Sequence, residues 1–168
     1  MKLTLVLFLL FSLSGIPDID QVRAKYKKAI DSEPETEAGL KLLEMVSKNE
    51  PLLYAYKGAY TALLAKHASN PYTKLEKVKQ ASAILDEAVT ADAAHIEIRY
   101  LRYSMEKNIP SFLPYREHID QDEDKIIAAL TTKTDGLSPA LRKEIVAFML
   151  KNAQLEPEEK KLLESLTR

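Results

Sequence analysis

The placement of proline, together with apolar periodicity, restricts this chain to short and sharply delimited helices. Its eight prolines lie between apolar-periodic segments or at their starts. Proline is tolerated in the first turn of a helix, where its missing N–H would have no partner, but it disrupts the helix interior. Within the segments, apolar residues recur at intervals of three and four, as on one face of a helix. The sequence therefore predicts an all-α fold in which prolines mark helix boundaries.

Capping residues mark the same boundaries and divide the chain into about seven or eight helices. Three pairs have the spacing of a capping box: Asp18 with Gln21, Thr73 with Glu76, and Asp120 with Glu123. The predicted helices cover about 19–31, 35–47, 52–67, 74–90, 94–107, 121–133, 139–152 and 157 onward. The alternation within 96–100 also suits a strand, but apolar residues continue beyond it at helical spacing. Short loops predict antiparallel neighbours, and thus stacked helical hairpins.

The first fifteen residues have the pattern of a secretory signal peptide. Lys2 precedes an apolar run from Leu3 to Leu13, and the small residues Ser14 and Gly15 follow it. An apolar stretch of about 7–15 residues is typical of such peptides and is shorter than the roughly 20 that span a bilayer. An uncleaved anchor and a buried first helix are the alternatives. We expect a signal peptide over 1–15, a single helical domain over 16–168, and an exported protein that is periplasmic or secreted.

Composition argues against several classes of function. The absence of Cys excludes disulfides, Cys nucleophiles and thiolate metal sites. The formal net charge of -1 argues against an extended surface for nucleic acid. The sequence contains no phosphate-binding glycine loop, no HExxH motif and no nucleophile elbow. We therefore expect no enzyme activity and no cofactor.

One acidic segment resembles a calcium-binding loop but departs from its pattern. His118 precedes a D-x-D-x-D sequence formed by Asp120, Asp122 and Asp124. The sixth loop position is Lys125 instead of Gly, and the twelfth position is not Glu. We therefore interpret these acids as caps for a helix N-terminus, and we expect no metal.

A charged cluster on two neighbouring predicted helices is the candidate binding site. Arg99 and Arg102 are three residues apart and share a helix face. The candidate ligand-binding residues are Lys57, Tyr60, Lys66, Glu97, Arg99 and Arg102. One interpretation is a pocket for an anionic group, such as a peptide carboxylate or a sugar acid, bound by guanidinium groups. The other is that Glu97 pairs with Arg99, Arg102 or Lys57 and links the helices.

The segment 52–108 resembles a tetratricopeptide-type helical hairpin. Ala81, Leu85 and Ala88 have the spacing of the motif's two small residues and the large apolar residue between them. Tyr54 and Gly58 resemble its aromatic residue and the glycine at a close helix contact. The connection from Gly58 to Ala81 is about ten residues longer than a repeat of roughly 34 residues allows, and Ala93 replaces an expected Pro. The resemblance implies a degenerate repeat with an enlarged turn.

A second resemblance covers the segment from Tyr54 to Tyr115, a little over a third of the chain. This segment is similar to a set of uncharacterised secreted helical proteins of Bacteroidetes-type bacteria. The residues that carry the similarity are 56–59, 65–67, 70–74, 97–102 and 110–113. The resemblance implies a helical, exported protein and implies no activity.

These observations favour a binding or scaffolding module over an enzyme. A helical stack offers a groove, and the sequence supplies Arg, Lys and Tyr without a recognisable catalytic set. We expect a protein or peptide partner in the cell envelope, no nucleic acid, and no membrane span after signal cleavage. The alternatives are an enzyme with a non-standard site near Glu97, His95 and Tyr60, or a small subunit of an envelope complex. The latter predicts an exposed apolar patch around Phe148 and Leu150.

Overall fold

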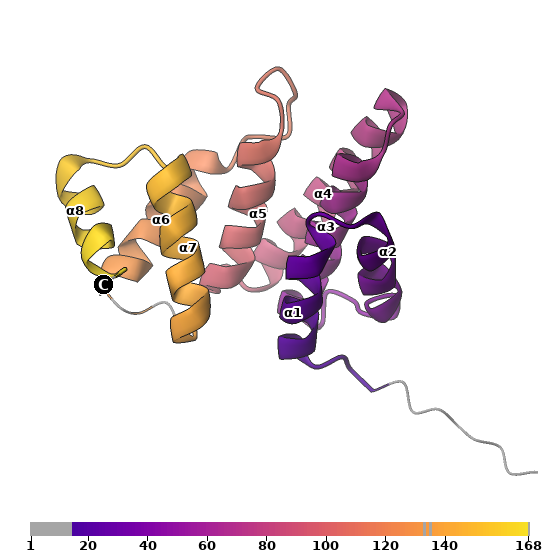
Figure 1. Cartoon of the computed structure of the whole chain (residues 1–168), viewed down its shortest axis with the longest axis horizontal. Helices are drawn as coiled ribbons and strands as arrows, with labels where there is room; N and C mark the ends of the chain where they lie inside the picture. The colour runs from indigo at the N-terminus through magenta and orange to yellow at the C-terminus, as the bar shows by residue number, and fades with distance from the viewer. Residues whose placement is uncertain (1–14, 133, 135, 168) are drawn as a thin grey trace, which may run out of the picture.

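The computed structural model describes residues 15–132, 134 and 136–167, and these residues form eight helices and no strand (Figure 1). The helices are α1 (Ile19–Ala29), α2 (Glu33–Leu42), α3 (Pro51–His67), α4 (Pro71–Ala91), α5 (Ile96–Asn108), α6 (Ile119–Thr132), α7 (Pro139–Asn152) and α8 (Pro157–Ser165). The predicted all-α fold is confirmed. The predicted signal peptide lies outside the described residues, except for Gly15.

Proline opens the helices as the sequence predicts. A proline occupies the first or second position of α2, α3, α4, α7 and α8, which are five of the eight described helices. Side chains accept hydrogen bonds from the first free N–H groups at several of these starts, for example Ser138 from the N–H of Leu141. Asp18 likewise accepts from the N–H of Gln21 at 2.9 Å.

Three predicted boundaries are wrong. Helix α4 begins at Pro71 rather than 74, because Asn70, not Thr73, caps it by accepting from the N–H of Tyr72. Helix α2 ends at Leu42 rather than 47. The segment after it turns, and the Glu50 carboxylate accepts hydrogen bonds from the N–H and hydroxyl of Ser47.

The third wrong boundary is the start of α6, at Ile119. Glu123, which we expected in a capping box with Asp120, is buried and accepts a hydrogen bond from the N–H of Gln154 at 2.8 Å. The hydroxyl of Tyr103 donates a second bond to Glu123. Burial raises the pKa of this Tyr103, and its bond to the Glu123 carboxylate adds to the rise. Glu123 therefore links α5 and the segment after α7 rather than capping its own helix.

Each helix packs against the next in the chain, and several pack against the helix two positions along. In Figure 1, α1–α4 lie on one side of α5 and α6–α8 on the other. Two apolar clusters form the core: one combines residues of α1–α5, and the other combines residues of α5–α8. Helix α5 contributes to both, with Ile98 and Leu101 in the first and Ile96 and Tyr103 in the second. The arrangement is a stack of helical hairpins in which α5 is central.

The apolar patch expected around Phe148 and Leu150 is not an exposed patch in the structure. Both residues are partly buried and pack against the second apolar cluster. The Phe148 ring makes edge contacts with Tyr100 at 5.5 Å and with Tyr103 at 6.0 Å between centroids. Among residues 15–132, 134 and 136–167, no helix is long and apolar enough to cross a membrane.

Two glycines permit close helix contacts. A Cβ atom at Gly58 would lie 2.8 Å from Cγ of Leu85, so α3 and α4 approach each other as the sequence predicts. A Cβ atom at Gly39 would lie 2.1 Å from Cε1 of Tyr60, which places the α2 backbone directly against the Tyr60 ring. The sequence analysis did not identify this second contact.

Replacing Gly39 with Ala is expected to destabilise the fold. Helix propensity favours Ala by about 1 kcal/mol, but the added methyl must displace the buried Tyr60 ring, and overpacking of this kind costs roughly 1–3 kcal/mol. We expect the free energy of unfolding, measured with urea, to fall by about 1 kcal/mol. Glu37→Ala is the control, because Glu37 lies on the exposed face of the same helix. Equal stability of the two variants would contradict the close contact.

Candidate binding groove and buried charge network

Glu97 is buried on α5, and its partners come from α1 and α3. Its carboxylate, 1% exposed, accepts from Nε and Nη2 of Arg23 at 2.8 and 2.5 Å. The hydroxyl of Tyr56 donates a third bond at 2.7 Å. The bond to Glu97 raises the pKa of Arg23, and burial raises the pKa of Tyr56, with the Glu97 charge adding to it. Glu97 is thus saturated by two residues that the sequence analysis did not assign to it.

Arg99 and Arg102 converge on one buried carboxylate of α6, that of Asp122. Arg102 binds it with two nitrogens, Nε at 2.8 Å and Nη2 at 2.9 Å, and Nη1 of Arg99 donates at 2.7 Å. In addition, Nε of Arg99 donates to the carbonyl of Ala93, and Nη1 of Arg102 donates to Asp86. Hydrogen bonds to Asp122 and Asp86 raise the pKa of Arg102 despite its burial. Both guanidinium groups are buried and donate mainly to partners within the chain, which favours a structural role over anion binding.

The other three predicted site residues lie apart from this network. Nζ of Lys57 donates to the carbonyls of Glu44 and Val46, at 2.9 and 3.1 Å, and so fastens the turn after α2. Nζ of Lys66 donates to the carbonyl of Ile30 and pairs with Asp31 at 3.0 Å.

Tyr60 donates its hydroxyl to the carbonyl of Val22 at 3.2 Å, and burial raises its pKa to about 12. The structure therefore divides the six predicted site residues among separate clusters, each with intramolecular partners. This distribution favours the helix-linking interpretation, with partners different from those we expected for Glu97. Glu97 and Tyr60, which also belong to the alternative enzyme site, each have hydrogen-bond partners elsewhere in the chain.

The sequence marks two members of this network, Asp122 and Arg23, as inward-facing, although it does not show which residues they pair with. Asp122 stands four residues before Ile126 and eight before Leu130, so it shares the inward face of α6. Arg23 follows the buried Val22 and precedes Tyr26 by three positions on α1. A charged residue at helical spacing on an apolar face signals a buried pair, but the sequence does not name its partner.

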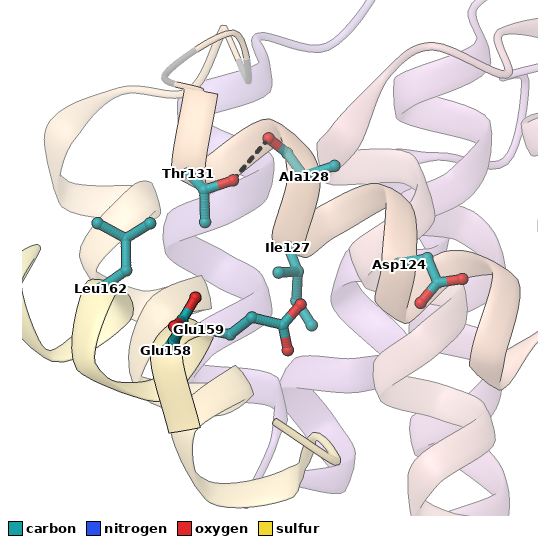
Figure 2. A pocket seen from close by; sticks show the side chains of 7 residues that line it. All are labelled: Asp124, Ile127, Ala128, Thr131, Glu158, Glu159 and Leu162. Atoms are coloured by element: carbon teal, nitrogen blue, oxygen red, sulfur yellow. Dashed lines mark hydrogen bonds between the residues drawn. The ribbon is translucent and has the colours of Figure 1, made fainter. Parts of the chain in front are cut away.

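A groove of about 320 Å³ lies between α6 and α8 (Figure 2). Its lining residues are Asp124, Ile127, Ala128 and Thr131 from α6, and Glu158, Glu159 and Leu162 from α8. The apolar part comprises Ile127, Ala128 and Leu162, and the last of these side chains is 43% exposed. Figure 2 shows Asp124 at one end, with the two glutamates across the groove on α8.

Among the residues that the structure describes, no cation pairs with the carboxylates of this groove. Asp124 and Glu158 make no hydrogen bond or ion pair within the described part of the chain. Glu159 accepts one hydrogen bond, from the N–H of Glu156 at 3.0 Å, as part of a capping box. The side-chain hydrogen bond drawn in Figure 2, from the Thr131 hydroxyl to the carbonyl of Ala128, lies within α6. The groove thus presents three negative charges beside an apolar surface.

A wider hollow of about 510 Å³ lies between α2 and α3, lined by Leu40, Lys41, Glu44 and Lys57. Its Lys57 already donates to two backbone carbonyls. Its lining combines two lysines with one glutamate, whereas the lining of the α6–α8 groove has three carboxylates and no basic residue.

No family model, curated protein or solved structure matches this chain. The function is therefore argued from the geometry.

Removing the charge of Asp122 is expected to be strongly destabilising. Asp122→Asn leaves two buried guanidinium groups without their shared carboxylate, and breaking a buried pair from one side costs about 3–5 kcal/mol. Asp124→Asn, two residues along the same helix, should change stability by less than about 0.5 kcal/mol, because Asp124 is exposed. Chemical denaturation of both variants measures the difference. An equally small loss of stability for Asp122→Asn and Asp124→Asn would show that the buried network is not important for stability.

Proposed function

We propose that the protein is a protein- or peptide-binding module of the cell envelope, and that its α6–α8 groove binds a segment with Lys or Arg beside an apolar residue. The observation that carries this proposal is a set of three carboxylates around Ile127, Ala128 and Leu162 that have no cationic partner among the described residues. Charge complementarity selects the partner and its orientation, while the apolar contact contributes affinity. A single groove of this size accommodates one or two side chains, so binding is weak and sensitive to salt.

Three further features agree with a binding role. The buried ionisable groups of α5 are held by intramolecular partners, as in a structural core. The buried carboxylates of Glu97, Asp122 and Glu123 accept from a cation or an N–H group, whereas Asp124 and Glu158 have no such donor within the described part of the chain. The apolar leader over residues 1–15 supports export, and hence a partner in the envelope.

The groove proposal predicts a specific loss on neutralising its acids. An array of eight-residue peptides, varied in charge and apolar content, is probed with the purified protein. We expect retention of peptides with Lys or Arg adjacent to Leu or Phe. Asp124→Asn combined with Glu158→Gln should weaken this retention by about tenfold, since two ion pairs of about 0.5–1 kcal/mol each are lost.

The control removes the same two charges elsewhere. Asp92→Asn combined with Glu164→Gln keeps the groove intact, because Glu164 lies on the opposite face of α8 from Leu162. This control should bind as the unmodified protein does, and both double variants should retain the circular dichroism of folded helices. Retention without preference for basic peptides, or equal retention by both double variants, would refute the groove proposal.

A further inference from the structure

Three helices bring one histidine and two carboxylates together at a point outside the groove. Asp86 lies on α4, Glu106 on α5, and His118 immediately before α6. One potential ligand atom from each lies within 4.8 Å of the other two. Nδ1 of His118 is 2.9 Å from Oε1 of Glu106 and 3.6 Å from Oδ1 of Asp86. The cluster is therefore compact and is formed by tertiary packing, not by a sequence motif.

The spacing of these atoms suits a small divalent cation. Zinc binds imidazole nitrogen and carboxylate oxygen at about 2.0–2.2 Å, so its ligands in a tetrahedron stand roughly 3.4 Å apart. The two measured separations, 2.9 and 3.6 Å, lie on either side of that value. Asp86 and His118 have side chains 40% and 32% exposed, which leaves access for the ion and for water as a further ligand.

Groups around the cluster orient its ligands. Nη1 of Arg102 donates to Oδ1 of Asp86 at 3.0 Å, and Arg102 is itself fixed by Asp122. The backbone N–H of His118 donates to Oε2 of Glu106 at 3.0 Å. Such outer contacts hold metal-binding carboxylates in place.

The local charge also favours a cation. Glu106 is 1% exposed, and burial raises its pKa, while hydrogen bonds from His118 and the charge of Arg102 oppose this rise. Arg102 serves Asp122 as well as Asp86. The nearby Arg116 donates Nη1 to the backbone carbonyls of Glu106 and Ile109 instead of to the carboxylates. The two carboxylates of Asp86 and Glu106 therefore share one arginine with Asp122, so their negative charge is only partly neutralised.

We propose that Asp86, Glu106 and His118 form a binding site for a divalent transition-metal ion, with zinc as the best match. The nitrogen ligand disfavours magnesium and calcium, which prefer oxygen ligands alone, and the affinity order favours zinc over manganese. Binding replaces the proton between His118 Nδ1 and Glu106. A neutral imidazole moves that proton to Nε2, and an imidazolium releases one proton to solvent, so affinity decreases in acid.

The test is a zinc titration of the purified protein by isothermal calorimetry, with cobalt absorbance as a second readout. We expect one ion per chain, an increase in Tm, and a visible cobalt band of the intensity typical of low-coordinate sites. Asp86→Asn and His118→Gln should each raise Kd by tenfold or more. Asp86 is half-exposed, so its variant should remain folded, which circular dichroism confirms.

Matched controls separate this site from general zinc binding. Asp92→Asn, at the end of the same helix as Asp86, and His67→Gln, at the end of α3, should leave Kd unchanged. Absence of saturable binding, or one-to-one binding that survives Asp86→Asn and His118→Gln, would overturn the proposal.

Discussion

The structure depends on pairing the charges that α5 carries into the core. Glu97, Arg99, Arg102 and Glu106 are all buried, although they alternate with the apolar residues that join the two halves of the core. Their partners come from other helices and loops: those of Glu97 lie on α1 and α3, the arginines share Asp122 of α6, and Glu106 contacts His118 just before α6. The position of α5 is therefore set by polar geometry as well as by burial.

This pairing has a cost that apolar packing does not have. Desolvating an ion costs several kcal/mol, and a buried pair regains it only when its hydrogen bonds are complete. The bidentate contact of Arg102 with Asp122, completed by Arg99, meets that condition. An apolar core would tolerate rotation or sliding of α5, whereas a shift of one residue would leave these charges buried without partners. We infer that the network fixes the register between the two halves of the stack.

The sequence predicts the parts of this fold that depend on local chemistry. Proline positions and caps such as Asp18 and Ser138 act within a few residues, so helix number and most boundaries could be predicted. A boundary is mispredicted where two nearby residues can both cap the helix. Asn70 lies just before Pro71 and caps α4 in place of Thr73. The partners of the buried charges could not be predicted, because Arg23 and Glu97 are 74 positions apart and many pairings satisfy the same helix faces. Asp122 was placed among capping residues, although its spacing to Ile126 marked it as inward-facing.

The same pairing separates structural charges from those available for binding. Glu97, Arg99 and Arg102 were candidates because of their charge density, and all three belong to the buried network. Charged residues on a buried helix need charged or polar partners from neighbouring helices. Charges free to bind others are found where packing leaves them unmatched. Within the described part of the chain, Asp124 and Glu158 meet this condition at the α6–α8 groove, where three carboxylates lie beside an apolar surface. Asp86 and Glu106 meet it in part at the edge of the network, where Arg102 is shared with Asp122. We therefore base both binding proposals on charges that packing leaves unmatched, and not on the density of charge.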